Sequence, residues 1–147
     1  MSEHFSLEDL TRSQTASRKG IDNTPPQQAI DSLNLLCSTL LEPARALLGV
    51  PLSVDSGFRC EALNEAVGGA KTSAHLDGRA ADLVPQGMDL QTAFDALRKS
   101  DLPYDQIIFE CKAWIHLAIA RPGETPRRMA LTAAGGPGHW TYQEVTK

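Results

Sequence analysis

The spacing of apolar residues predicts a long amphipathic helix in the first third of the chain. Apolar residues recur at helical spacing from Ile30 to Leu47, and Gly49 follows as a C-terminal cap. Thr24 is expected to cap the start, with prolines in the first turn. Pro43 predicts a kink, because its nitrogen cannot donate a hydrogen bond. The expected apolar face consists of Ile30, Leu33, Cys37, Leu40, Ala44 and Leu47, flanked by Leu36, Leu41 and Leu48.

The residues before this helix are more polar. Ser6 and Asp9 have the spacing of a capping box, which predicts a short helix there. Residues 12–23 show no periodicity and are expected to form an arm wrapped over the domain. Residues 1–24 are therefore predicted to be a partly irregular N-terminal arm.

After the long helix the pattern changes to short strands with helices between them. Alternating or continuous apolar runs predict strands at 51–56, 80–84, 106–110, 114–119 and 128–133. Helices are expected at 61–67 and after Asp89. The two strands separated by residues 111–113 should form a hairpin, and the last strand should lie at the sheet edge, before the turn at 135–138. The expected fold is α+β, with N-terminal helices packed on a small antiparallel sheet and one crossing helix.

Length and composition limit the number of domains and the classes of partner. With 147 residues, 41% of them hydrophobic, the chain is long enough for one domain with its own core, so we expect a single domain over residues 1–147 and a monomer. The net charge of −4 provides no basic surface, which argues against nucleic-acid binding. The three cysteines include no CxxC pair, which argues against a disulfide framework or a thiolate-rich metal site.

The N-terminus is polar and acidic, and no apolar run approaches the roughly 20 residues of a membrane span. We expect no membrane span and no signal peptide. The protein is expected to be made in the cytoplasm and to reach an extracytoplasmic target only if it is released.

The predicted hairpin brings a histidine and a glutamate, side chains able to bind a metal or transfer a proton, to one face of the sheet. Side chains alternate along a strand, so His116 and Trp114 point away from the face that carries Ile115. Glu110 should lie opposite Trp114, one diagonal step from His116. A glutamate that is merely solvated at a hairpin end is the alternative.

A second group of candidate residues lies upstream. His75 precedes Asp82 by seven residues with Gly78 between them, and Asp82 lies in a strand of small apolar residues, where a buried acid needs a partner. Two imidazoles and one carboxylate are recurrent ligands of catalytic zinc. We therefore predict a metal site formed by His75, Asp82 and His116. Each residue alone has a plainer interpretation, as a surface histidine, a strand-end hydrogen-bonding acid or a solvated sheet residue.

These residues form a pattern that resembles a known family. The segment Ser73-x-His75-x-x-Gly78-x-Ala80-x-Asp82 is similar to the SxHxxGxAxD motif of the zinc D-Ala-D-Ala carboxypeptidases and related peptidoglycan peptidases, the M15 group, which includes phage endolysins. Upstream, Ser56-Gly57-Phe58-Arg59 with Leu63-Asn64 resembles the family's SGYR…LN segment, and Trp114-Ile115-His116 resembles its last zinc-ligand strand. The resemblance implies the Hedgehog/D-Ala-D-Ala peptidase-like fold, with zinc on the open sheet face.

Carried over to this chain, the resemblance implies roles for individual residues. His75, Asp82 and His116 would hold Zn²⁺. Arg59 would bind a substrate carbonyl or the developing oxyanion, a surface salt bridge being the alternative, and Ser73 would support the loop or contact the peptide.

The general base is where the chain departs from the family pattern. The positions two and three residues before the last ligand, where many members carry a histidine or an acid, are Trp114 and Ala113 here. Glu110 is our candidate replacement, because the hairpin brings it to the correct face. Trp114 would then line the cleft or pack over it.

Three further ionisable residues, His4, Asp77 and His139, have plainer expected roles. His4 and His139 are expected to be exposed or packing residues, and Asp77 could accept a hydrogen bond from a ligand imidazole.

The resemblance implies a zinc peptidase that cleaves an amide bond in peptidoglycan stem peptides, as a D,D-carboxypeptidase or an endopeptidase. It would act on the cell wall after release, as in phage lysis. Two alternatives stay open: a noncatalytic zinc domain that binds wall peptides or a protein partner, and a zinc-free fold with a decayed site.

Overall fold

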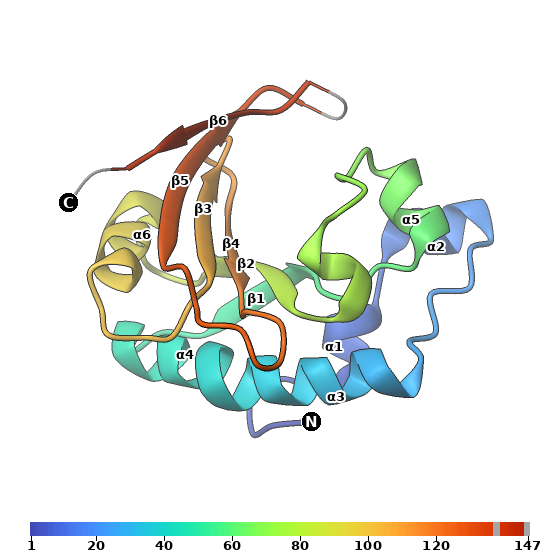
Figure 1. Cartoon of the computed structure of the whole chain (residues 1–147), viewed down its shortest axis with the longest axis horizontal. Helices are drawn as coiled ribbons and strands as arrows, with labels where there is room; N and C mark the ends of the chain where they lie inside the picture. The colour runs from blue at the N-terminus through green and yellow to red at the C-terminus, as the bar shows by residue number, and fades with distance from the viewer. Residues whose placement is uncertain (137–138, 146–147) are drawn as a thin grey trace.

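A computed structural model describes residues 1–136 and 139–145 of the chain (Figure 1). Its helical elements are α1 (Leu7–Thr11), α2 (Gln14–Lys19), α3 (Gln27–Leu36), the π-helical turn η1 (Cys37–Leu41), α4 (Glu42–Leu48), α5 (Glu61–Ala66), the 3-10 turn η2 (Ala74–Asp77) and α6 (Leu90–Arg98). Its strands are β1 (Leu52–Ser56), β2 (Ala80–Pro85), β3 (Gln106–Glu110), β4 (Trp114–Ala118), β5 (Met129–Ala134) and β6 (Thr141–Glu144). The α+β class expected from the sequence is confirmed.

The strands form one sheet in the order β1-β2-β4-β3-β5-β6. Neighbouring strands are antiparallel except β3 and β5, which are parallel. The prediction of an antiparallel edge strand at 128–133 was therefore wrong, because β5 is parallel to its neighbour and β6 lies outside it. The predicted turn at 135–138 falls partly outside the described residues.

The reason for the parallel pairing lies in the hairpin. The chain leaves β4 at Ala118, which is paired with Gln106 at the start of β3. Since β2 already occupies the other side of β4, the free position is beside β3. Residues 119–128 carry the chain across to that position, so β5 begins at the same end as β3 and runs in the same direction.

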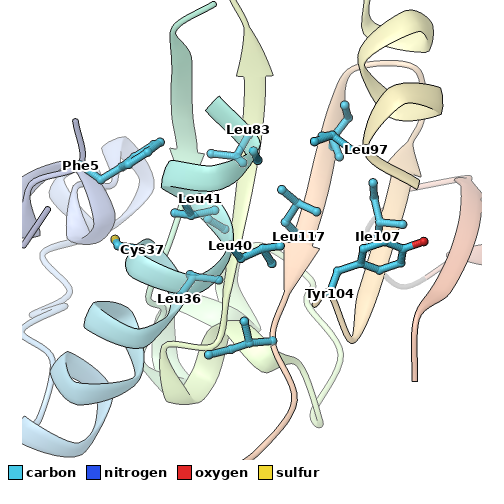
Figure 2. Packing of buried hydrophobic residues seen from close by; sticks show 14 of the residues in the cluster. Phe5, Leu36, Cys37, Leu40, Leu41, Leu83, Leu97, Tyr104, Ile107 and Leu117 are labelled. Atoms are coloured by element: carbon cyan, nitrogen blue, oxygen red, sulfur yellow. The ribbon is translucent and has the colours of Figure 1, made fainter. Parts of the chain in front are cut away.

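The long helical segment α3–η1–α4 and helix α6 cover one face of the sheet and bury the main core. Helices α3 and α4 run along the base of the molecule in Figure 1, with α6 beside α4. In Figure 2, Leu36, Leu40 and Leu41 of the long helical segment lie near side chains of the strands. The strand residues of this core include Leu83, Ile107, Ile115 and Leu117. The opposite face of the sheet carries the polar residues considered below.

Cys37 belongs to this core, as expected for a small hydrophobic residue. It is fully buried, and burial raises the pKa of its thiol to about 11. The Cys37 thiol therefore stays protonated and unreactive.

The long helix contains the predicted interruption, but in an unexpected form. The π-helical turn η1 ends just before Pro43, and the N–H of Glu42 bonds to the carbonyl oxygen of Cys37, five residues back. This wider turn rotates the apolar face by about one residue. Leu48 is consequently buried and Leu47 is 51% exposed, the reverse of what an uninterrupted helix predicts.

The N-terminal arm is more ordered than its sequence indicates. The capping box of Ser6 and Asp9 is present and begins α1. Residues 14–19 form α2, where no helix was expected. The predicted cap at Thr24 was wrong: its hydroxyl donates to Asp22, and α3 begins at Gln27 without a side-chain cap.

Within the described residues, no helix has the length and apolar character needed to cross a membrane.

Candidate metal centre

The 3-10 turn η2 positions His75. The Ser73 hydroxyl accepts a hydrogen bond from the His75 backbone N–H at 3.2 Å, which fixes the start of the turn. The turn ends at Gly78, whose φ of 77° lies in the left-handed region. The ends of the turn thus account for two residues of the SxHxxG pattern.

The sheet positions the other two members of the cluster. Asp82 on β2 and His116 on β4 are direct partners across the antiparallel ladder, so their side chains leave the same face of the sheet. All three side chains are buried, with residue exposures of 1% for His75, 5% for Asp82 and 6% for His116.

The three side chains converge on one point. His75 Nε2 lies 3.2 Å from Asp82 Oδ1 and 3.2 Å from His116 Nδ1, and His116 Nδ1 lies 3.0 Å from Asp82 Oδ1. Ligand atoms about 2.0–2.1 Å from a tetrahedral zinc ion stand about 3.3–3.4 Å apart, so these separations suit a shared ion.

Hydrogen bonds alone do not account for this triangle. His75 Nδ1 lies 2.6 Å from the Gly57 carbonyl oxygen, which can only accept, so Nδ1 carries the proton. Burial lowers the pKa of His75, which keeps the imidazole neutral and leaves a lone pair on Nε2. That lone pair faces a carboxylate oxygen of Asp82. Burial opposes ionisation of Asp82, but the two histidines together lower the pKa of the carboxyl below its ordinary value.

The His75 Nε2 lone pair and the Asp82 carboxylate oxygen repel each other, and a cation bound by both would remove that repulsion. A neutral imidazole that donates its other N–H to a backbone carbonyl, beside an ionised carboxylate, is the usual arrangement of metal ligands. Within the described residues, His75, Asp82 and His116 are the group of side chains able to hold a metal ion together. The chemistry of the donor set therefore fits a divalent metal such as zinc.

Glu110 lies beside the cluster, where the hairpin geometry predicts it. It pairs with Trp114 across the β3–β4 ladder, and its Oε1 lies 3.9 Å from His116 Nδ1. The indole N–H of Trp114 donates to Glu110 Oε2 at 3.0 Å. Burial and the charge of Asp82 raise the pKa of Glu110. The structure thus places a carboxyl group with a raised pKa next to the His75–Asp82–His116 cluster.

Arg59 approaches the cluster from the segment after β1. Its backbone N–H donates to the His75 carbonyl oxygen at 3.0 Å, and its Nη2 lies 3.4 Å from the Ser73 hydroxyl. Its Nε is buried and has no hydrogen-bond partner among the described residues. Burial lowers the pKa of the guanidinium, whereas the charges of Asp82 and Glu110 act in the opposite direction. The guanidinium therefore retains hydrogen-bonding capacity close to the cluster.

Comparison with known families agrees with this geometry. The sequence model of the family described as Peptidase M15 matches residues 3–118. The chain belongs to the peptidase M15 family. The match contains the whole His75–Asp82–His116 cluster, and membership identifies the protein as a hydrolase. No curated protein matches the chain.

In this M15 family member, the His75–Asp82–His116 cluster lies in an open cleft of about 1320 Å³. One wall is built by the α1–α2 region and the loop after α5, including Ser13, Thr15 and Ala70. The other wall is built by residues of β5 and of the β6 region, including Leu131, Trp140 and Tyr142. This second wall cannot be predicted from the sequence, because it depends on where β5 and β6 enter the sheet.

The remaining candidate residues have other partners. Asp77 does not hold an imidazole: its Oδ2 accepts from Arg79 Nε at 2.8 Å, and the Gly57 carbonyl holds His75 instead. His4 is exposed but bonds to Glu42 through both its backbone N–H and Nδ1. His139 is exposed, as expected. The side chains to which the sequence assigned ligand and catalytic roles lie together in the cleft, and the roles themselves stay predictions.

Proposed function

We propose that this M15 member is a zinc-dependent peptidase that hydrolyses an amide bond in bacterial peptidoglycan stem peptides, as a D,D-carboxypeptidase or an endopeptidase. The observation that carries the proposal is the convergence of two imidazoles and a carboxylate, with Glu110 and Arg59 beside them in one cleft. Release onto the cell wall, as in phage lysis, would bring the enzyme to this substrate.

His75, Asp82 and His116 would hold the zinc ion. When bound, zinc supplies Lewis-acid chemistry, which polarises a carbonyl group and activates water near neutral pH. The protein contributes a buried, fixed set of donor atoms. The Gly57 carbonyl holds the His75 ring in the tautomer that leaves Nε2 free.

Glu110 is the proposed general base and acid. Its carboxylate would accept a proton from the attacking water and then deliver that proton to the leaving amine. The hydrogen bond from Trp114 to Oε2 fixes the carboxylate and leaves Oε1 on the side of His116.

Arg59 is the proposed electrophilic group. Arg59 lines the cleft, so its guanidinium can donate to a substrate carbonyl and more strongly to the oxyanion that develops from it. Ser73 would keep η2 and Arg59 in place, and Trp114 would form part of the substrate surface.

The test combines metal analysis with digestion of purified peptidoglycan. The wild-type protein is expected to contain one zinc ion per chain and to release muropeptides whose masses identify the cleaved bond. The Glu110→Gln variant should retain zinc while its kcat falls by about 10²–10⁴. Glu65→Gln, which alters an exposed glutamate on α5, is the matched control and should behave as wild type.

Other results would assign a different function. Zinc-loaded wild-type protein that cleaves no muropeptide would indicate a noncatalytic zinc domain that binds wall peptides or a protein partner. Protein that binds no metal would indicate a decayed site. Full activity of Glu110→Gln would remove Glu110 from the mechanism but leave the zinc assignment intact.

A further inference from the structure

A second apolar cluster lies on the open face of the sheet, separate from the main core. Ile108, Leu131 and Ala133 of β3 and β5 are each less than 10% exposed, and Met129 and Trp140 pack against them. These residues face the cleft rather than the helices, since Ile108 is the ladder partner of His116. The apolar floor therefore begins immediately beside the metal cluster.

The strand registers place Tyr142 in the same row as Glu110. Across the sheet, Glu110 pairs with Ala133, and Ala133 pairs with Tyr142. Ala133 is small, so the Tyr142 ring can extend over it toward Glu110. Tyr142 lines the cleft and is 51% exposed. Burial raises the pKa of the Tyr142 phenol, and the charges of Glu110 and Asp82 raise it further.

This wall belongs to the C-terminal part of the chain. The family match ends at residue 118, whereas β5 and β6 begin at Met129 and Thr141. The metal cluster and the aromatic wall thus come from different parts of the sequence and meet only through the sheet.

We propose that Tyr142 and Trp140, over the floor of Ile108, Leu131 and Ala133, form a specificity subsite that receives an uncharged aliphatic side chain of the substrate next to the scissile bond. The inference rests on the proposed function, since it assigns a side-chain preference to the same cleft. Continuity of the apolar floor with His116 and Glu110 places the subsite beside the reacting amide.

The chemistry of the lining favours an aliphatic occupant. The residues Ile108, Met129, Leu131, Ala133, Trp140 and Tyr142 carry no charge. A charged side chain would lose part of its hydration against this apolar lining. An acidic side chain would also be repelled by Glu110 and Asp82. A cationic side chain stacked on the aromatic rings near Glu144, the ladder partner of Leu131, is the competing occupant.

The first experiment measures selectivity. Synthetic peptides based on the peptidoglycan stem would carry alanine, leucine, lysine or glutamate on either side of the tested amide bond. At one of these positions, wild-type kcat/KM should be at least about tenfold higher for alanine or leucine than for lysine or glutamate. Tyr142→Ala should lower kcat/KM about tenfold for the aliphatic peptides and change the charged ones by less than about twofold.

Two control variants separate the ring from other effects. Tyr142→Phe keeps the ring and should retain the selectivity. Leu47→Ala removes a side chain of equal exposure on α4, outside the cleft, and should leave all rates unchanged.

Binding gives a second readout that does not depend on turnover. The only tryptophans of the chain, Trp114 and Trp140, both line the cleft, so their fluorescence should report peptide binding. In the Glu110→Gln background, Tyr142→Ala should raise the Kd of the alanine peptide about tenfold without changing that of the lysine peptide.

Three results would overturn the subsite. The first is an equal fall in kcat/KM for all peptides in Tyr142→Ala, and the second is a fall in Tyr142→Phe as large as that in Tyr142→Ala. The third is a wild-type preference for the lysine peptide, which would favour the cationic occupant. A wild-type protein that cleaves none of the peptides but binds the alanine peptide through Tyr142 would contradict the proposed peptidase while supporting the subsite.

Discussion

Gly57 connects backbone packing to the candidate metal centre. A Cβ atom at this position would overlap the carbonyl oxygen of Leu10, so the close approach of α1 to the end of β1 requires glycine. The neighbouring Phe58 N–H donates to the same Leu10 oxygen at 2.7 Å. Because the Gly57 carbonyl holds His75 Nδ1, any shift here also moves His75, a proposed metal ligand.

The Gly57→Ala substitution should therefore affect stability and metal binding together. We expect a loss of about 1–3 kcal/mol in the free energy of unfolding from overpacking. Zinc affinity should fall about 10–100-fold as the outer hydrogen bond to His75 is disturbed. Urea denaturation and zinc titration measure the two effects.

Gly136→Ala is the matched control, because an added Cβ there meets open space, and its unfolding free energy should change by less than about 0.5 kcal/mol. Unchanged zinc affinity in a destabilised Gly57→Ala protein would separate the packing role from the metal role.

At the scale of elements, the π-helical turn decides which leucine of α4 is buried. The residue pattern alone assigns Leu47 to the apolar face, whereas the wider turn buries Leu48 instead. The neighbouring residues therefore form an internal comparison, since both are leucines on the same helix.

Leu48→Ala should lower the free energy of unfolding by about 2–4 kcal/mol, because it removes buried methyl groups from the core. Leu47→Ala should change it by less than about 0.5 kcal/mol. Thermal or urea unfolding of the two variants tests the register of α4, and the reverse order of effects would show an uninterrupted helix.

Asp105 joins β5 to the rest of the sheet. It is 6% exposed and accepts hydrogen bonds from the backbone N–H and the guanidinium of Arg127. Its carbonyl oxygen accepts from the Met129 N–H at the start of β5. The bonds from Arg127 lower the pKa of Asp105, although burial acts in the opposite direction.

A carboxyl whose pKa is lowered in the folded state stabilises the fold above its unfolded-state pKa of about 3.9. That stabilisation is lost as the pH falls through the folded-state value. Asp105→Asn should cost about 1–3 kcal/mol at pH 7, and the difference from wild type should shrink below about pH 4. Urea denaturation at several pH values measures this.

Asp95→Asn is the comparison, because the Asp95 side chain is 37% exposed and pairs with Arg98 within one helix, α6. This substitution should cost no more than about 0.5 kcal/mol. An Asp105→Asn penalty that stays constant down to pH 3 would contradict the role of the charge.

At the scale of the whole molecule, the candidate metal site joins segments far apart in the chain. Its ligands come from η2, β2 and β4, and the His75 carbonyl and ring are tied to Arg59 and Gly57 after β1. A ligand that binds only the folded chain stabilises all of these elements at once.

Zinc should therefore raise the unfolding temperature. Free zinc at a thousand times its Kd adds about 4 kcal/mol. For a domain of this size that corresponds to an increase of about 10 °C over the chelated protein. Differential scanning fluorimetry with chelator and with added zinc measures the shift. Asp82→Asn should lose the zinc-dependent shift, and a shift that persists in this variant would place the metal elsewhere.

The sequence by itself determined the local elements and the candidate residues of the site. Period-2 alternation placed His116 opposite the core face, and the three-residue connection at 111–113 brought Glu110 to the same side, because these relations involve neighbouring strands. The SxHxxGxAxD spacing likewise placed His75 in a short turn and Asp82 in the strand that directly follows it.

Only the tertiary structure decided the relations that cross the chain. These include the parallel β3–β5 pairing, the shifted face of α4, the choice of Gly57 rather than Asp77 as partner of His75, and the aromatic wall of Trp140 and Tyr142. Each depends on which surfaces remain free once the other elements have packed, and residue spacing along one segment contains no information about that.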